Sequence, residues 1–216
     1  MPAAHESRSV LRFVSASPSA VVKLGGSLLD LPDLVSRLEH WRPLWGARPL
    51  LVVGGGAAAN LVREWDQQSQ LGEQRAHWLA LDSLELTARF LAALWPVARV
   101  VSRSEIESSW GQGVLPVIRP REWFEAAGRA SERTPPHTWE TTTDTIAAWV
   151  ASVSQAESLW LLKSVECADS LGEAARLELV DPQFVHWVPT GLPVQWVNFR
   201  EVSGTARLRR LNALEK

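Results

Sequence analysis

The chain runs Val21-Val22-Lys23-Leu24-Gly25-Gly26-Ser27-Leu28-Leu29 near its start, an apolar segment that ends in a glycine pair. The β-branched residues are typical of a buried strand, and the glycines and serine predict a tight turn into a helix. Because glycine has no Cβ, backbone N–H groups in such a turn can approach an anion, and the Lys23 ammonium can reach the same place. The stretch therefore predicts a phosphate-binding loop. The alternative is a strand that ends in an ordinary turn, with Lys23 solvated.

A second stretch repeats this design, and it runs Leu50-Leu51-Val52-Val53-Gly54-Gly55-Gly56-Ala57-Ala58-Ala59-Asn60. Its small residues allow the loop and the following helix to lie close to a ligand or to each other. Neither loop has the Gly-Lys-Ser/Thr of a Walker A motif or the Gly-x-Gly-x-x-Gly fingerprint. Two glycine loops after two early strands can face one crevice at the carboxyl edge of an open α/β sheet, where such sheets bind ligands.

Strand-like and helix-like patterns alternate along the chain. The expected strands span residues 20–24, 50–53, 98–101, 114–118, 159–162 and 194–199. The expected helices span residues 31–45, 57–70, 74–95, 122–128 and 141–153, and residues 183–188 form either a short helix or an extended piece. The helix at 141–153 is expected to begin with a threonine N-cap and to carry Asp144 in its first turn. This alternation favours a mostly parallel sheet with helices on both faces.

Composition excludes several classes of protein. The 216 residues carry a formal net charge of -2 with a pI of about 6.2, so no nucleic-acid partner is expected. The single cysteine, Cys167, forms no internal disulfide and fits a reducing, cytoplasmic setting. The most apolar window, residues 84–101, is interrupted by charges and Pro96, so no membrane partner is expected either. Residues 1–18 lack the apolar core of a signal peptide and are expected to form a flexible tail before one domain, residues 19–216.

Four motifs in this order resemble the amino acid kinase superfamily. The segment 23–27 is similar to its Lys-x-Gly-Gly-Ser opening, and 54–56 to its second glycine loop. The run Thr143-Asp144-Thr145-Ile146-Ala147-Ala148 is similar to its Asp-Ser/Thr-x-Ala segment, and Leu161-Leu162-Lys163-Ser164-Val165 stands where the family has Leu-Leu-Thr-Asp-Val. The resemblance implies a carbamate kinase-like α/β fold, a three-layer α-β-α sandwich with a mostly parallel central sheet. It also implies an acceptor and phosphate lobe at about 19–135 and a nucleotide lobe at about 136–216.

The resemblance also implies roles for individual residues. Lys23 would stabilise the transferred phosphoryl group, and Asp144 would orient that lysine; as a plain helix-start carboxylate, Asp144 would contribute only about 0.3–1 kcal/mol. The residues expected to bind the nucleotide or its phosphates are Gly25, Gly26, Ser27, Lys163 and Ser164. The residues expected to bind the acceptor are Gly54, Gly55, Gly56, Arg63 and His77. The implied cofactors are ATP and Mg²⁺, the metal held mainly by phosphates and water rather than by protein ligands. The alternatives are a rim position for Lys163, a structural hydrogen bond for His77 and a solvated Arg63.

Two departures from the family pattern affect the expected activity. The nucleoside-binding segment lacks the family's threonine and aspartate and has Lys163 and Ser164 instead. Many members also have a second catalytic lysine late in the chain, but no lysine lies here between Lys163 and Lys216. The run Ser203-Gly204-Thr205-Ala206-Arg207-Leu208 resembles the Gly-Thr ending of short members. Arg207 could supply the missing cation there, although without the geometry of a lysine.

Three further segments resemble a compact group within the superfamily, namely His77-Trp78, residues 137–144 and Val180-Asp181-Pro182. This group includes the kinase of methanofuran biosynthesis, which converts an aminomethylfuran phosphate to the diphosphate, and it has relatives in bacteria with tetrahydromethanopterin-linked one-carbon metabolism. The implied function is an ATP-dependent phosphotransferase that acts on a carboxylate or phosphate of a small metabolite, as a homodimer or higher homo-oligomer. The alternatives are a non-catalytic nucleotide- or anion-binding sensor, and a storage or scaffold oligomer.

Overall fold

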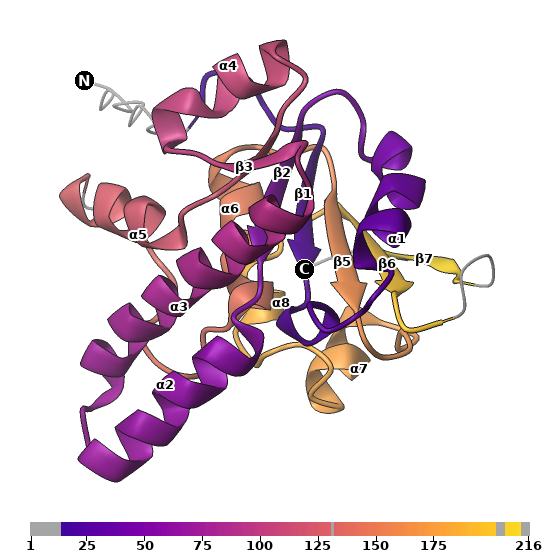
Figure 1. The fold of residues 1–216 in the computed structure, drawn as a ribbon. Helices are drawn as coiled ribbons and strands as arrows, with labels where there is room; N and C mark the ends of the chain where they lie inside the picture. Colours follow the sequence, from indigo (N-terminus) through magenta and orange to yellow (C-terminus); the bar gives the residue numbers. More distant parts are fainter. Residues whose placement is uncertain (1–13, 131, 202–205, 213–216) are drawn as a thin grey trace, which may run out of the picture.

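The computed structural model describes residues 14–130, 132–201 and 206–212. Within them, seven strands form one sheet in the order β3-β4-β2-β1-β5-β6-β7 (Figure 1). All neighbouring pairs are parallel except the pair of β6 and β7, which is antiparallel. The strands are β1 (Ala20–Leu24), β2 (Pro49–Val53), β3 (Ala98–Val100), β4 (Leu115–Val117), β5 (Leu159–Lys163), β6 (Pro193–Asn198) and β7 (Leu208–Asn212).

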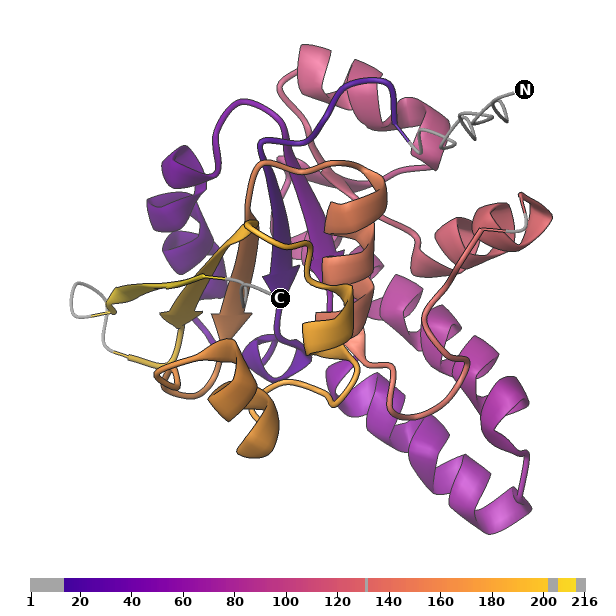
Figure 2. The same cartoon turned by 180° about the vertical axis from the view of Figure 1, so that it is seen from behind.

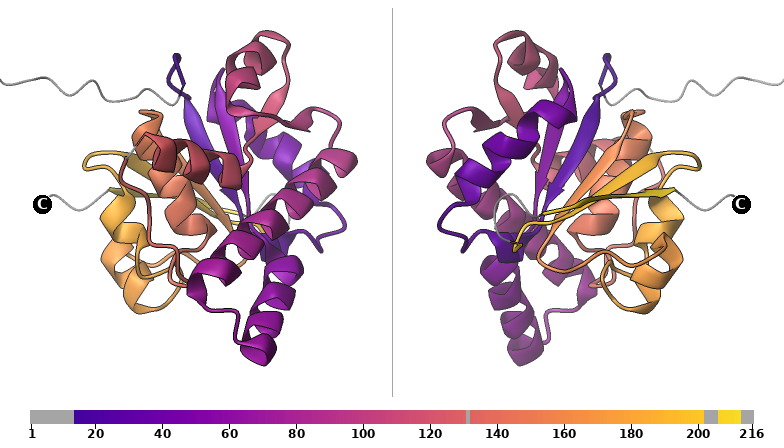
Figure 3. Two further views of the ribbon diagram at one scale, coloured as in Figure 1. Left: turned by 90° about the vertical axis from the view of Figure 1, so that its left-hand side faces the viewer. Right: turned by 90° about the vertical axis from the view of Figure 1, so that its right-hand side faces the viewer.

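Helices connect the strands and cover both faces of the sheet (Figures 2 and 3). The α-helices are α1 (Leu34–Trp41), α2 (Gly56–Ser69), α3 (Glu73–Leu94), α4 (Ile106–Gly111), α5 (Pro120–Arg129), α6 (Thr143–Val153), α7 (Leu171–Arg176) and α8 (Phe184–Trp187). Three short 3₁₀ helices complete the set, η1 (Gly26–Leu28), η2 (Arg42–Trp45) and η3 (Arg103–Glu105). None of the described helices is long and apolar enough to cross a membrane.

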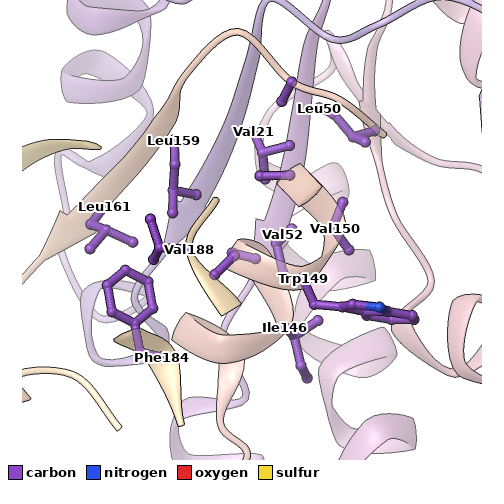
Figure 4. Packing of buried hydrophobic residues seen from close by; sticks show 14 of the residues in the cluster. Val21, Leu50, Val52, Ile146, Trp149, Val150, Leu159, Leu161, Phe184 and Val188 are labelled. Atoms are coloured by element: carbon purple, nitrogen blue, oxygen red, sulfur yellow. The ribbon is translucent and has the colours of Figure 1, made fainter. Parts of the chain in front are cut away.

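Alternate residues of the central strands enter two separate apolar clusters. Val21 and Leu161 pack with Trp149 of α6 and Phe184 of α8 on one face (Figure 4). The residues between them pack on the other face with α1 and the C-terminal half of α3. Side chains along a strand point to opposite faces in turn, so each strand is buried on both sides. The predicted three-layer α-β-α sandwich with a mostly parallel sheet is therefore confirmed.

The register of the central strands positions the candidate site. Lys23 of β1 lies opposite Val52 of β2 and Leu161 of β5. Lys163 is two residues beyond Leu161, so it shares the sheet face of Lys23, the face covered by α6. Strands β1, β2 and β5 end at the same edge, which brings both glycine loops and Lys163 together.

Some local expectations needed correction. The helix expected at 31–45 is divided into α1 and η2, the latter with Pro43 near its start. The short elements α4, α7 and β7 were not anticipated. Most of the expected flexible tail, residues 1–13, lies outside the described residues. Its last part, residues 14–18, is packed on the domain, where the N–H groups of Ser15 and Ala16 donate to the Glu107 carboxylate at 2.6 and 3.0 Å.

Candidate active site

Two lysines share one buried carboxylate at the carboxyl edge of the sheet. Lys23 lies near the end of β1, Lys163 ends β5, and Asp144 lies in the first turn of α6. The Lys23 Nζ forms an ion pair with Asp144 Oδ1 at 2.8 Å, and the Lys163 Nζ donates to Asp144 Oδ2 at 2.7 Å. The side chains of Lys23, Asp144 and Lys163 are only 7%, 5% and 12% exposed. Asp144 therefore holds two ammonium groups beside each other.

The charges of this group perturb one another. Burial alone would raise the pKa of Asp144, but the nearby Lys23 and Lys163 charges outweigh burial, so the pKa lies below its usual value. The pKa of Lys163 is lowered, first by burial and then by repulsion from Lys23, although Asp144 opposes both effects. Two ammonium groups beside one carboxylate leave a net positive charge at this edge, which favours an anionic ligand.

Asp181, just before α8, secures the start of α6. Its Oδ2 accepts hydrogen bonds from the N–H and hydroxyl of Thr142 at 3.1 and 2.7 Å and from the Thr145 N–H at 3.0 Å. Its Oδ1 accepts from the Thr145 hydroxyl and from the Gln183 N–H. Thr142 occupies the expected N-cap position, but its hydroxyl bonds to Asp181 and does not cap the helix itself. The expected threonine cap is thus replaced by a distant carboxylate.

The two glycine loops contact each other through their backbones. A Cβ on Gly26 would lie 2.1 Å from the Gly56 N, and a Cβ on Gly54 would lie 2.5 Å from the Gly26 N. Gly56 has a φ of +51°, in the left-handed region that favours glycine. These three glycines are required by the close contact between the loops.

Not all loop N–H groups are available to a ligand. The Gly25 N–H donates to the Leu162 carbonyl at 2.9 Å, and the Gly54 N–H donates to the Leu24 carbonyl at 2.8 Å. The expectation of open donors at Gly25 and Gly54 is therefore wrong, because these N–H groups continue the bonding between strands. The N–H groups of Gly26 and Ser27 form no hydrogen bond to other described residues. The available donors thus lie one residue further along the first loop.

A cavity of about 240 Å³ adjoins the two lysines. It is lined by residues 23, 25–27, 163–165, 178 and 179. All five residues expected to bind the nucleotide or its phosphates therefore line one cavity. The Ser27 hydroxyl donates to the Ser164 hydroxyl at 3.0 Å across it. The donor set of two ammonium groups, two hydroxyls and free N–H groups suits phosphate oxygens.

A second cavity of about 70 Å³ lies on the side of the second glycine loop. Gly55, Arg63 and His77 line it together with apolar side chains such as Leu84 and with Trp139. Gly54 and Gly56, also expected to bind the acceptor, contact the first loop instead. The Arg63 guanidinium lies 4.8 Å from the centre of the Trp139 ring, so it is not simply solvated. Three of the five expected acceptor residues thus meet at one cavity.

His77 is a buried, neutral imidazole beside this second cavity. Its ring stacks on His137 with 4.7 Å between centroids, and its edge meets Phe124 at 5.1 Å. Burial, and then the neighbouring His137, lowers the pKa of His77 to about 4. Its Nε2 and the Thr138 hydroxyl are both buried without a hydrogen-bond partner in the described part of the chain. Such groups are rare in proteins and are commonly satisfied by a ligand or water.

The structure also corrects the expected source of a second cation. Arg207 lines a different cavity, of about 150 Å³, with Glu166 and Arg209. The residue beside Lys23 is instead Lys163, which the sequence had suggested as a phosphate ligand or a rim lysine. Sequence reasoning missed its pairing with Asp144 and the role of Asp181. The sequence held one signal for the pairing of Lys163 with Asp144, namely that Lys163 follows Leu161 by two residues. This signal could be interpreted only with the register of the strands.

Comparisons with known proteins identify the family of the chain. The model of the amino acid kinase family matches residues 19–167, and the chain belongs to that family. A curated relative is the [5-(aminomethyl)furan-3-yl]methyl phosphate kinase of Methanocaldococcus jannaschii, which is 20% identical over 147 residues. The match covers 68% of this chain and 66% of that relative, just under two thirds of its length.

Two solved structures are similar to this chain. The UMP kinase of Bacillus anthracis is 13% identical, with a TM-score of 0.55, over 90% of this chain and 99% of that chain. The uridylate kinase of Archaeoglobus fulgidus is 21% identical, with a TM-score of 0.49, over 68% of this chain and 64% of that chain. The first of these supports the family's α/β fold for almost the whole chain.

Proposed function

We propose that the chain transfers the terminal phosphoryl group of ATP to a carboxylate or phosphate of a small metabolite. The observation that carries this proposal is the buried Asp144 shared by Lys23 and Lys163 beside the first glycine loop. Phosphoryl transfer needs little covalent chemistry from the protein, and it depends on positioned cations and donors around the transferred group. The family of the chain supports a phosphotransferase in general, and the site supports this more specific activity.

The two lysines stabilise the transferred phosphoryl group together in this proposal. Each ammonium places a positive charge beside the oxygens on which negative charge is redistributed during transfer. Two ammonium groups so close together would repel, and Asp144 offsets that repulsion without occupying the cavity. Lys163 thereby takes the part of the late lysine that the chain lacks. The pair is held by strands β1 and β5, which fixes its geometry before any ligand binds.

The larger cavity fits the phosphates of a nucleotide. The N–H groups of Gly26 and Ser27 and the hydroxyls of Ser27 and Ser164 would hold them, with the two lysines. Bound ATP supplies the phosphoryl group. Among the described residues, no group of three His, Cys, Asp or Glu side chains is placed to hold a metal ion. We expect phosphate oxygens and water to be the main ligands of Mg²⁺.

The smaller cavity is assigned to the acceptor. Gly55 lines the smaller cavity, and its neighbours Gly54 and Gly56 contact Gly26 of the first loop. An acceptor in the smaller cavity would therefore lie beside the transferred group. Arg63 would pair with an anionic group of the acceptor, and His77, being neutral, would hydrogen-bond without adding charge. The name of the M. jannaschii relative supplies the first acceptor to test, an aminomethylfuran phosphate. We assign the acceptor and phosphate lobe to about residues 19–135 and the nucleotide lobe to about residues 136–216.

The test measures ADP release with MgATP and a panel of small carboxylates and phosphates that includes the aminomethylfuran phosphate. Lys23→Ala and Lys163→Met are each expected to lower turnover by about 10²–10³, as for removal of one preorganised donor. Arg207→Met is the matched control and is expected to keep wild-type turnover, because Arg207 lines another cavity. Near wild-type turnover of either lysine variant would contradict the proposal. ATP binding by calorimetry without ADP release on any acceptor would favour a nucleotide sensor.

A further inference from the structure

Asp181 lies outside both cavities, but its carboxylate is buried and bonded to the start of α6. Its carboxylate is buried, and it forms no ion pair within the part of the chain that the structure describes. Burying a carboxylate without a cation is unfavourable unless several donors satisfy it. Four of its five hydrogen bonds come from Thr142 and Thr145, which flank Asp144 in sequence. Asp181 is therefore bound to the short stretch that carries the shared carboxylate.

These bonds fix the first turn of α6. Thr142 is the N-cap residue, and neither its side chain nor any other side chain of the helix caps that turn. Both the N–H and the hydroxyl of Thr142 and of Thr145 end on one carboxylate, so this turn cannot rotate or slide without breaking several bonds. The Asp144 oxygens lie 2.8 and 2.7 Å from two lysines on different strands. A small displacement of the turn would lengthen one of these contacts.

We propose that Asp181 is a positioning residue that keeps Asp144 between Lys23 and Lys163, so that both ammonium groups face the transferred phosphoryl group. This inference rests on the proposed kinase activity. Asp181 does not touch the phosphate cavity, and it acts only through α6 and through its charge. A side chain that merely stabilised the fold would not alter the ionisation of Lys163, whereas Asp181 is expected to do so.

The charges around Lys163 set the direction of that effect. Lys23 faces it from β1, Asp144 from α6 and Asp181 from the segment before α8, while the Trp196 ring of β6 lies 5.5 Å from its Nζ. Asp181 attracts the Lys163 proton and raises its pKa, against burial and Lys23. Removing the Asp181 charge, or letting Asp144 move away, lowers the pKa of Lys163 further. Loss of the Asp181 charge and movement of Asp144 therefore change the pKa of Lys163 in the same direction.

The experiment compares Asp181→Asn with wild type and with Asp169→Asn, a control in which an exposed carboxylate paired with Arg209 is lost. Asparagine keeps the shape and one acceptor oxygen but loses the charge. The pH dependence of Lys163 acetylation by trace acetic anhydride is read by mass spectrometry. It reports lysine ionisation whether or not the protein is a kinase. ADP release is measured alongside it as separate kcat and KM values.

For Asp181→Asn, we expect the Lys163 labelling curve to shift to lower pH and kcat to fall at least tenfold, with the KM for ATP changed less than threefold. The alkaline limb of the kcat profile should move down in pH with the labelling curve. Asp169→Asn should match wild type in each measurement. If Asp181→Asn does not fold, Thr145→Val removes one bond only and should give a smaller shift in the same direction.

Two results would overturn the inference. An unchanged Lys163 labelling curve in a folded variant would show that Asp181 does not act on the site, and a shifted curve with unchanged kcat would show that the effect is irrelevant to transfer. Failure of the proposed function looks different, because wild type would then release no ADP with any acceptor. The labelling curves would still decide whether Asp181 controls the ionisation of Lys163.

Discussion

Replacing Asp144 by asparagine tests the central feature of the site. The substitution keeps the size of the side chain and removes the charge shared by Lys23 and Lys163. If Asp144 were only a helix-start carboxylate, asparagine would change the free energy of unfolding by about 1 kcal/mol at most. The structure predicts a larger loss, because two buried ammonium groups remain without their counter-charge. Breaking a buried ion pair typically costs about 3–5 kcal/mol.

We expect the lower end of that range, about 3 kcal/mol, since both lysines line a cavity that gives them some contact with water. For a domain of this size, the melting temperature should fall by roughly 6–12 °C at neutral pH. The low pKa of Asp144 means that its contribution in wild type is present above the pKa of an unfolded aspartate and is lost as the pH falls through its folded pKa. The difference between variant and wild type should therefore shrink in acid.

The difference should also shrink in alkali, because Lys163, whose pKa is already lowered, can release its proton in the variant and then no longer needs a counter-charge. The assays are thermal melting at pH 7 and urea unfolding at pH 7 and pH 9.5, applied to both proteins. The surface variant Asp169→Asn is the control, and a change of about 1 kcal/mol or less is expected for it. Turnover of Asp144→Asn should fall at least tenfold, equivalent to about 1.4 kcal/mol. A melting temperature within 2 °C of wild type at pH 7, about 1 kcal/mol or less on the same scale, would refute this reasoning.

Two further predictions concern the loops and the second cavity. Gly26→Ala should cost about 1–3 kcal/mol of stability and most phosphate binding in calorimetry, because its Cβ would overlap the Gly56 backbone. Gly111→Ala, in a helix with open space around it, should be neutral or slightly stabilising, and equal effects of the two substitutions would contradict the assigned contact. Since the pKa of His77 is lowered to about 4, the folded protein binds fewer protons than the unfolded chain between about pH 4 and 6.5, and stability falls as the pH drops through that window. His77→Phe should remove about 2–3 kcal/mol of the loss between pH 7 and 4.5 in urea unfolding, and parallel pH dependences of the two proteins would exclude this assignment.

The sequence predicted the parts of the site that depend on local pattern. Lys23 and the two glycine loops follow apolar strands, and parallel strands place their carboxyl ends together, so a common edge could be expected from residues alone. The carbonyl partners of the Gly25 and Gly54 N–H groups were not predictable in this way. They depend on how far each strand pairing continues, which is a property of the neighbouring strand.

The pairing of Lys163 needed information that the sequence does not contain. That Lys163 shares a face with Lys23 follows from the residue-by-residue register of β1 and β5, and these strands are separated by more than a hundred residues. Asp181 was visible only as part of a family-like Val-Asp-Pro run. Its bonds to Thr142 and Thr145 arise because α8 packs on α6, a tertiary contact with no local signal.

The contact between Gly26, Gly54 and Gly56 limits how this protein can move. The backbones of the two loops are in close contact, so neither loop can open as a separate flap. Under the proposed function, the phosphate and acceptor sites then keep a spacing set by main chain. The wall of the second cavity that contains Trp139 is also joined to α2, because the Trp139 Nε1–H donates to Asp66 at 2.7 Å. Because the loops are rigid, substitutions in the second cavity need not alter the positions of the loop glycines. Under the proposed function, Arg63, His77 and Thr138, which line the second cavity, can diverge to suit a new acceptor while the glycines keep the geometry of transfer.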